Sequence, residues 1–396
     1  MNGTIYMPVG EACSSISDTY REKKNMVTLI NTSDVLEGRV LNHERVPNSN
    51  LKGQFKKTFQ RDDILYSEIR PQNRRFAYVD FSPIDYIAST KLMVIRAKKD
   101  VVSPKYLYYF LKNTSTVAEL QLLAETRSGT FPQITFSEVA NLTIPVPSLA
   151  VQEVIVQTMQ CLEDKITCNE QINDNLQQQA AAIFRSWFVD CAPFGGKAPD
   201  EWKNVTLEDI TALISRGITP KYADDTDQIV INQKCIRNHT IDLSLARTHT
   251  PKVINEKWLR FGDLLINSTG DGTLGRAAQV WFQPKNLTVD SHVTIARPAK
   301  ENLIFYIGLW GILHEKEIES LHTGSTGQTE LPRDRVKAME LRLPDNDTLD
   351  RFNALITPMA TAIVANQEEN NRLAALRDAI LPKLMSGEID VSAVQL

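Results

Sequence analysis

The side chains best suited to chemistry in this 396-residue sequence are polar groups with forked or two-pronged ends, set in segments rich in turn residues. Arginine matches the two major-groove acceptors of guanine, and asparagine or glutamine matches the acceptor and donor of adenine. The densest group runs from Arg70 to Arg75 and holds three arginines beside Phe76. For any single residue, a solvated surface role is the alternative. The candidate base readers are Arg70, Gln72, Asn73, Arg74, Arg75, Arg127 and Gln133 in the first half of the chain, and Asn267, Arg276, His292, Arg297 and Gln328 in the second.

A glycine-rich segment that begins at Gly270 and ends at Gly275 matches the GxGxxG pattern of dinucleotide-binding turns, with Asp290 at the distance of a ribose-binding acid. A dinucleotide site requires a helix after the glycines, but the residues from Arg276 to Phe282 are apolar and prone to form a strand. The corresponding segment of the first half, residues 68–75, has no glycine. We therefore expect a hairpin tip. A nucleotide-dependent enzyme built on this loop stays an open alternative.

Other catalytic signatures are absent from the sequence. There is no GxxxxGK[ST] phosphate loop, no HExxH, no nucleophile elbow and no Asn/Asp-Pro-Pro-aromatic tetrad of adenine methyltransferases. The five cysteines form no CxxC pair and have no histidines at zinc-finger spacing, so we expect buried thiols and no metal site. The joint absence favours a binding protein over an enzyme.

Composition and charge limit the class of protein. With 42% hydrophobic and 23% charged residues the chain is that of an ordinary folded protein. No apolar stretch approaches the roughly 20 residues that span a bilayer, and no signal pattern begins the chain, so we expect a cytoplasmic protein. The net charge of −4 is uneven: residues 1–145 carry 19 basic against 15 acidic residues, and residues 345–396 carry 4 against 8. The pairs Lys23-Lys24, Lys56-Lys57 and Lys98-Lys99 are candidate phosphate contacts.

An internal repeat divides the chain. Six residues of one segment recur 197 positions later without a gap, and Pro147 recurs as Pro344. Both copies lie in long segments of helical periodicity, each preceded by short strand-like runs. The order is therefore module, helix, module, helix. The recurring residues are Ile166, Asn169, Asn173, Leu176, Ala182 and Ile183, which match Ile363, Asn366, Asn370, Leu373, Ala379 and Ile380.

Each helical segment carries a narrow apolar stripe in steps of three and four, as in the seam of a coiled coil. At about 1.5 Å per residue, a helix of about 40 residues is roughly 60 Å long and cannot bury such a stripe alone. The natural partner of each copy is the other copy, with seam asparagines fixing the register. The periodicity leaves parallel and antiparallel pairing open.

The two modules share strand-like runs while their loops diverge, which places recognition chemistry in the loops. Asp63-Ile64-Leu65 matches Asp263-Leu264-Leu265, Val27-Thr28-Leu29 matches Val205-Thr206-Leu207, and Asn42-His43 matches Asn238-His239. A helix is expected near residues 104–111 in the first module and near 303–313 in the second.

The duplicated organisation and three local patterns resemble the specificity subunit of Type I restriction-modification systems. The patterns are Asp62-Asp63-Ile64-Leu65 with Gly262-Asp263-Leu264-Leu265, the loop from Ser128 to Thr135, and Leu142-Thr143-Ile144-Pro145-Val146-Pro147-Ser148 leading into the helix that carries Gln152. One departure is the second helix entry, Leu343-Pro344-Asp345-Asn346, which lacks the paired prolines of the first.

The resemblance implies an α+β fold in which two mixed α/β target-recognition domains, residues 1–145 and 199–344, are separated by helical regions 146–198 and 345–396. In this family the helices form an antiparallel coiled coil with a pseudo-two-fold internal repeat. The family's ends also lie close together, so residues 1–25 and the tail after Gly387 are expected to be neighbours.

The resemblance also implies partners. They are double-stranded DNA with a bipartite, asymmetric site, two modification (methyltransferase) subunits, and restriction/translocase subunits. S-adenosylmethionine, ATP and Mg are bound by those subunits, so this chain is expected to have no cofactor and no catalytic residue, and no membrane contact. The alternative is a coiled-coil protein-binding scaffold without DNA specificity.

Overall fold

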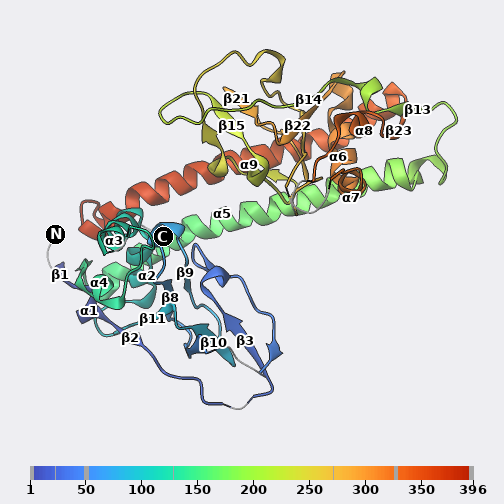
Figure 1. Cartoon of the computed structure of the whole chain (residues 1–396). Helices are drawn as coiled ribbons and strands as arrows, with labels where there is room; N and C mark the ends of the chain where they lie inside the picture. Colours follow the sequence, from blue (N-terminus) through green and yellow to red (C-terminus); the bar gives the residue numbers. More distant parts are fainter. Residues whose placement is uncertain are drawn as a thin grey trace. The chain divides into compact units, whose positions relative to one another are not determined.

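The computed structural model describes residues 4–22, 24–48, 53–127, 129–270, 272–324 and 329–391 (Figure 1). The chain divides into two compact units, each built from one module and pieces of both long helices. The first unit comprises residues 1–167 and 370–396, and the second comprises residues 168–369. No helix in the described part is long and apolar enough to span a membrane. Of the residues named above, Lys23, Ser128 and Gln328 lie outside the described ranges, as does Asp271 of the glycine-rich segment. The expectation of buried thiols is wrong for Cys161 and Cys168, which are exposed.

The first module contains two four-stranded sheets, in the orders β2-β11-β8-β9 and β6-β3-β10-β7, and a strand pair β1-β12. The first sheet is antiparallel, and in the second β3 and β10 pair in parallel. Its strands are β1 (Ile5–Pro8), β2 (Cys13–Ile16), β3 (Met26–Ile30), β4 (Val35–Leu36), β5 (Arg39–Val40), β6 (Val46–Pro47), β7 (Phe55–Lys57), β8 (Ile64–Ser67), β9 (Phe76–Tyr78), β10 (Tyr86–Ser89), β11 (Leu92–Ala97) and β12 (Thr143–Val146), and its helices are α1 (Val9–Ala12), α2 (Pro104–Lys112), α3 (Thr114–Arg127) and α4 (Phe136–Asn141).

The second module repeats this topology. Its sheet β14-β22-β19-β20 has the order of β2-β11-β8-β9, and β15 pairs with β21 in parallel as β3 pairs with β10. Its strands are β13 (Lys203–Thr206), β14 (Thr211–Arg216), β15 (Ile229–Ile231), β16 (Ile236–Arg237), β17 (Thr240–Ile241), β18 (Arg247–Thr248), β19 (Leu264–Asn267), β20 (Ala277–Gln279), β21 (Leu287–Val289), β22 (Val293–Pro298) and β23 (Glu340–Leu343), and its helices are α6 (Ile304–Leu313), α7 (Glu315–Ser320) and α8 (Arg333–Lys337).

Two of the three predicted matches between the modules are wrong. Val205 lies on β13, which pairs with β23 as β1 pairs with β12, so the strand equivalent to β3 is β15. Asn238 and His239 form the tip of the β16–β17 hairpin with positive φ at both residues, and their equivalents are Glu37 and Gly38 at the tip of β4–β5. Short similar sequences occur by chance, whereas strand pairing identifies the equivalent position. The match of β8 with β19 is confirmed.

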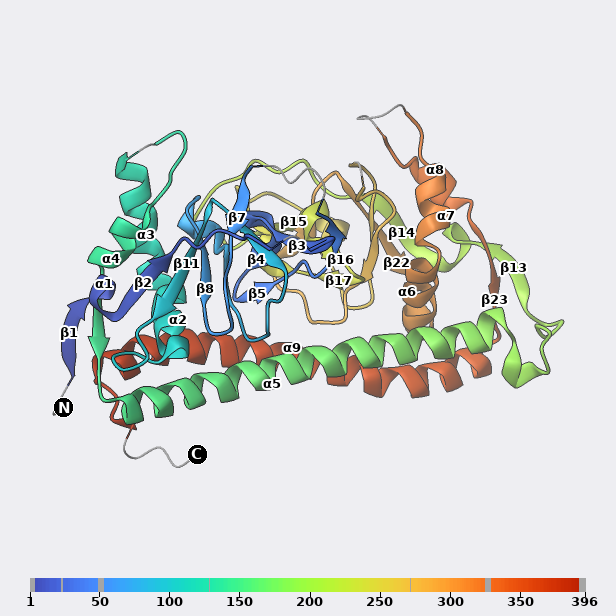
Figure 2. The same ribbon diagram turned by 90° about the horizontal axis from the view of Figure 1, so that it is seen from below.

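The long helices are α5 (Leu149–Phe184), which continues into a π-helical turn over Arg185–Val189, and α9 (Asn346–Ser386). In the first unit, the start of α5 packs against the end of α9, with Ile155 and Met159 in the same hydrophobic cluster as Leu381 and Leu384 (Figure 2). In the second unit, the end of α5 packs against the start of α9, where Phe184 joins the cluster of Phe352. The helices therefore pair antiparallel in each unit.

Asparagines interrupt the apolar seam between α5 and α9. In the second unit, Asn366 donates to the Oδ1 of Asn173 at 2.8 Å, and Asn169 donates to Glu369 at 2.7 Å. In the first unit, Asn370 donates to the carbonyl oxygen of Ile166 at 3.4 Å. A paired polar group in an apolar seam disfavours other registers, because a shifted helix would leave the amides buried without partners.

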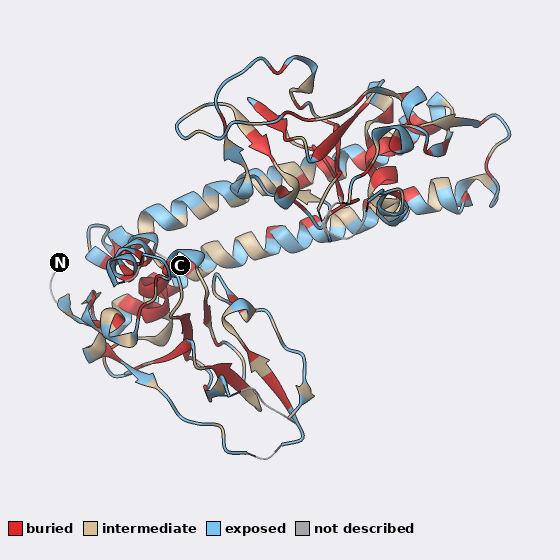
Figure 3. Ribbon diagram, viewed as in Figure 1, coloured by how far each residue is buried: buried red, intermediate tan, exposed pale blue. Residues whose placement is uncertain are grey.

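Buried residues concentrate on the strands of both modules (Figure 3). In the first unit, the cluster that includes Val9, Ala12 and Cys13 also contains Val391, which follows the end of α9. The two ends of the described chain thus share one core, as the resemblance led us to expect. Gln152 on α5 is fully buried and donates to the carbonyl oxygens of Val101 and Pro147.

Candidate nucleic-acid interface

In the first module the loop between β8 and β9, residues 68–75, lies against the segment that leads to α4. Ile69 forms a β-bridge with Gln133, and the amide of Arg70 donates to the carbonyl oxygen of Pro132 at 3.1 Å. The amide of Gln72 donates to the Gln121 side chain of α3 at 3.1 Å. The β8–β9 loop is therefore supported by α3 and by the segment that contains Pro132 and Gln133.

Three of the predicted base readers project freely from this loop. Arg70, Gln72 and Asn73 are exposed, and their side chains have no hydrogen bond or ion pair within the described residues. They belong to or precede a short 3-10 turn over Pro71–Asn73. A cation and two amides on one turn can each make two-pronged contacts with base edges.

Arg74 and Arg75, by contrast, bind the protein itself. Arg74 lies 3.3 Å from the carboxylate of Glu37 and donates to the carbonyl oxygen of Lys112 at 3.2 Å. Arg75 donates to the carbonyl oxygens of Ser33 and Val35 at 3.0 and 3.4 Å. Both arginines hold the loop in place, so neither is a free base reader in this conformation.

Arg127 and Gln133 flank the loop surface. Arg127 ends α3, forms an ion pair with Glu138 at 3.2 Å and keeps 56% of its side chain exposed. Gln133 accepts from Lys91 at 3.2 Å, and Lys91 also pairs with Glu68 at 3.3 Å. Both residues remain close enough to the surface to contact a phosphate or a base.

The equivalent loop of the second module, residues 268–276, is the hairpin tip that the sequence led us to expect. β19 and β20 on either side pair antiparallel, and no helix follows the glycines. His292 is exposed and its Nδ1 contacts the hydroxyl of Thr269 at 2.7 Å. Burial raises the pKa of the neighbouring Asp290, whose carboxylate accepts from the amide of His292. The half-buried Arg276 side chain has no ion pair or hydrogen bond with the described residues.

Two predicted base readers of the second module are corrected. Arg297 is 6% exposed and makes a two-pronged ion pair with the fully buried Asp263, with N–O distances of 2.8 and 2.7 Å. It also donates to the carbonyl oxygens of Glu256 and Trp258. Asn267 is fully buried and donates to the carbonyl oxygen of Gln233. Neither side chain can reach a base without local unfolding, so both are structural.

The Asp263–Arg297 pair has a counterpart in the first module. Arg96 binds the buried Asp63 with two hydrogen bonds of 2.7 and 2.8 Å, which raise the pKa of Arg96. Asp63 and Asp263, the aspartates of the family-like patterns Asp62-Asp63-Ile64-Leu65 and Gly262-Asp263-Leu264-Leu265, therefore belong to a duplicated internal ion pair. The sequence around an arginine near the end of a strand does not show whether its side chain faces the core or the solvent.

Lysines of two of the three pairs bind other groups of the protein. Burial lowers the pKa of Lys57, which donates to the carbonyl oxygens of Thr90 and Leu92. Lys99 pairs with Asp62 at 2.7 Å, and this hydrogen bond lowers the pKa of Asp62. Lys57 is therefore unavailable to phosphate in this conformation.

Residues 114–127 form the helix α3, which was not predicted from the sequence. This helix supports the β8–β9 loop through Gln121 and exposes Leu122, whose relative exposure is 62%. Its buried face, Val117, Leu120, Gln121 and Ala124, has helical spacing, which was the available signal. The polar Gln121 within that face and the exposed leucines next to it obscured the pattern.

Comparison with known proteins identifies the architecture. Residues 13–178 match the model of the Type I restriction modification DNA specificity domain. The chain is 28% identical to the Type I restriction enzyme HindI specificity subunit of Haemophilus influenzae, over 92% of this chain and 94% of that protein. It is 27% identical to the Type I restriction enzyme MjaIX specificity subunit of Methanocaldococcus jannaschii, over 78% of this chain and 76% of that protein.

The resemblance to Type I specificity subunits is confirmed. A solved structure, the S subunit of a Type I restriction-modification system from M. genitalium, has the same fold, with a TM-score of 0.53, 14% identity, and coverage of 97% of this chain and 96% of that one. The likeness to specificity subunits extends over both modules and both helices, so it includes the surfaces described above.

Proposed function

We propose that the chain is the sequence-specific DNA-binding subunit of a Type I restriction-modification complex, in which each module reads one half of a bipartite site. The single observation that carries this proposal is the duplication of one scaffold with unlike loops. The sheet β14-β22-β19-β20 has the strand order of β2-β11-β8-β9, whereas the β8–β9 loop exposes Arg70, Gln72 and Asn73 and the β19–β20 loop is rich in glycine. Two similar scaffolds with different surfaces suit two different half-sites.

The β8–β9 and β19–β20 loops would make the base contacts. Arg70 suits guanine, and Gln72 and Asn73 suit adenine. In the second module the candidates that remain at the surface are Arg276 and His292. Arg127 and Lys91 would contact phosphates beside the first loop.

The helices would set the spacing of the half-sites and dock two modification subunits. The described helices have 36 and 41 residues, which at about 1.5 Å per residue corresponds to lengths of roughly 54 and 62 Å. S-adenosylmethionine, ATP and Mg would be bound by the modification and restriction subunits. The chain itself would contribute recognition and no catalytic step.

The test is to map methylated adenines across the host genome in three strains: one with the gene, one without it, and one in which residues 199–344 are exchanged for the module of another family member. We expect a split motif that disappears in the deletion strain and changes in one half only in the exchange strain. An unaltered methylation pattern after deletion would refute DNA specificity and favour a protein-binding scaffold. A change in both halves after the exchange would refute the assignment of one module to each half-site.

A further inference from the structure

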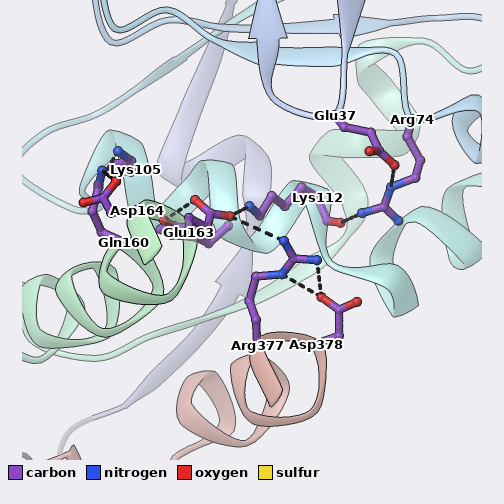
Figure 4. A network of polar contacts seen from close by, with 10 residues as sticks. Glu37, Arg74, Lys105, Lys112, Gln160, Glu163, Asp164, Arg377 and Asp378 are labelled. Carbon is purple, nitrogen blue, oxygen red and sulfur yellow. Dashed lines mark hydrogen bonds and ion pairs between the residues drawn. The ribbon is translucent and has the colours of Figure 1, made fainter. Parts of the chain in front are cut away.

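A continuous set of polar contacts joins the β8–β9 loop to both helices of the first unit (Figure 4). Arg74, directly after the exposed Asn73, donates to the carbonyl oxygen of Lys112 at 3.2 Å. The ammonium group of Lys112 forms an ion pair with Glu163 on α5. Glu163 in turn lies 4.0 Å from Arg377 on α9. The loop that exposes the candidate base readers is therefore tied to the helix pair through the end of α2.

The central ion pair is withdrawn from water. The side chains of Lys112 and Glu163 are 10% and 25% exposed, and that of Arg377 is 23% exposed. Burial lowers the pKa of Lys112, and the ammonium group also lies over the ring of Tyr109, whose hydroxyl donates to Glu163 at 2.9 Å. Lys112 depends on Glu163 most strongly, because removal of that carboxylate would leave the ammonium group buried and uncompensated. Arg377 also pairs with the neighbouring Asp378 at 2.8 Å.

The second unit shows that the fold itself does not need this network. Tyr106 and Tyr306 make the same hydrogen bond, to the carbonyl oxygens of Pro145 and Arg342, which aligns α2 with α6 at a shift of 200 residues. On that alignment the equivalent of Lys112 is Ile312. The 197-residue helix repeat gives the equivalents of Glu163 and Arg377 as the buried Ala360 and Ala180.

The same fold position is thus occupied by three ionised groups in one unit and by three apolar side chains in the other. Apolar residues stabilise such a contact at least as well as buried charges do, because the charges lose their hydration on folding. Stability alone therefore gives no reason for the polar version.

Arg74 itself is held against its backbone preference. Its φ is +52°, in the left-handed region that favours glycine, and the equivalent position of the second module is Gly275, with φ +84°. The equivalence follows from the strands, since Phe76 pairs with Tyr66 as Ala277 pairs with Ile266. An arginine kept where glycine is easier points to a use for its side chain.

We propose that Arg74, supported by the Lys112–Glu163–Arg377 network, is a positioning residue that fixes the turn carrying Arg70, Gln72 and Asn73, so that recognition of one half-site alone depends on this network. The inference rests on the proposed function and assigns the residues that regulate its accuracy in the first module. Without the Arg74 side chain the turn would still be held at Arg70, Gln72 and Arg75, but it would lose its ties to Glu37 and to the end of α2. A base contact with two hydrogen bonds is lost with small displacements.

The experiment uses the full chain assembled with its modification subunits, and measures methylation rates on duplexes with the native site or with one substitution in either half. Domain exchange identifies the half read by the first module. Arg74→Gly places the second module's own residue at this position and relieves the backbone. We expect about a tenfold loss of discrimination in the first half-site, the order of one good base contact, and a change of less than about twofold in the second.

A matched control is Arg45→Ala. Arg45 also bonds one carboxylate and one carbonyl oxygen, those of Asp85 at 3.3 Å and Met26 at 3.1 Å, but it lies in the first module outside the network. We expect it to leave discrimination in both half-sites unchanged. Arg74→Lys keeps the charge without the planar fork and should recover little of the loss.

A second variant, Lys112→Ile with Glu163→Ala and Arg377→Ala, imports the apolar set of the second unit, where that set is compatible with the fold. It should keep the thermal unfolding midpoint of the complex while lowering discrimination in the first half-site only. The inference is overturned if both variants discriminate as well as the wild type, or if both half-sites lose discrimination equally. If the wild-type complex itself has no sequence preference, the proposed function fails instead.

Discussion

Arg297→Met separates an internal role of Arg297 from a role in base reading. The guanidinium group makes two bonds of 2.8 and 2.7 Å with Asp263 and two more with the carbonyl oxygens of Glu256 and Trp258. The carboxylate of Asp263 is fully buried and also accepts from the amide of Arg260 at 2.8 Å. Methionine fills a similar volume but leaves a buried charge without its cation.

We expect this substitution to lower the free energy of unfolding of the second unit by about 3–5 kcal/mol, the cost of breaking a buried ion pair from one side. A domain has about 5–15 kcal/mol in total, so the loss is a large fraction. Arg96→Met is the matched comparison in the first module. The side chain of Arg96 is 31% exposed, so its replacement would open a path for water to the buried Asp63, and we expect a smaller cost of about 1.5–3 kcal/mol.

Tryptophan fluorescence in urea measures the effect selectively, because all five tryptophans lie between residues 187 and 310, within the second unit. With a urea dependence of about 3 kcal/mol per molar, the midpoint should fall by about 1–1.7 M. Amide hydrogen exchange of β8 and β11 gives the corresponding value for Arg96→Met in the first unit.

The internal role of Arg297 is refuted if the urea midpoint of Arg297→Met lies within about 0.3 M of the wild-type midpoint while sequence discrimination is lost. Such a result would return Arg297 to the set of base readers. A double substitution, Arg297→Met with Asp263→Leu, should be less destabilising than the single one, because it removes the uncompensated carboxylate.

Three further outcomes follow from the second unit. The hydrogen bond that His239 donates to the carboxylate of Glu315 raises the pKa of His239 above its ordinary 6.5. The stabilisation of the β16–β17 tip should therefore be complete below pH 6.5 and disappear as the pH rises through the raised pKa, so the difference in urea midpoint between wild type and His239→Gln should shrink over that range. Gly275→Ala should cost about 1–2 kcal/mol or more, measured by the same fluorescence, because the left-handed backbone disfavours alanine and its Cβ would lie 2.8 Å from the Cβ of Glu319. Asn173→Leu should lower the free energy of unfolding by about 1–3 kcal/mol, because it leaves the side-chain amide of Asn366 without its acceptor. The double variant Asn173→Leu with Asn366→Leu should recover stability and allow other registers of the helix pair, which cross-linking would detect.

The order of modules and helices was predictable from the amino-acid sequence alone. A repeat of six residues at one spacing is visible without coordinates, because the helix seam requires apolar and asparagine side chains at regular intervals. The strands near residues 64 and 264 and the helices near 104 and 304 were also predictable, since periodic burial leaves a periodic pattern. The hairpin tip at the glycines followed from the β-prone residues after it.

Which polar side chains face the solvent could be determined only from the folded structure. Arg70 and Arg74 are four residues apart in one loop, yet the exposed Arg70 side chain has no partner among the described residues, whereas Arg74 binds Glu37 and a helix end. Arg297 looked like a surface arginine until its pairing with Asp263 was located. Whether an arginine meets solvent or a buried carboxylate depends on segments distant in sequence, which local patterns do not report. The antiparallel pairing of α5 with α9 was left open by the periodicity for the same reason, because a seam of identical spacing can be packed in either direction.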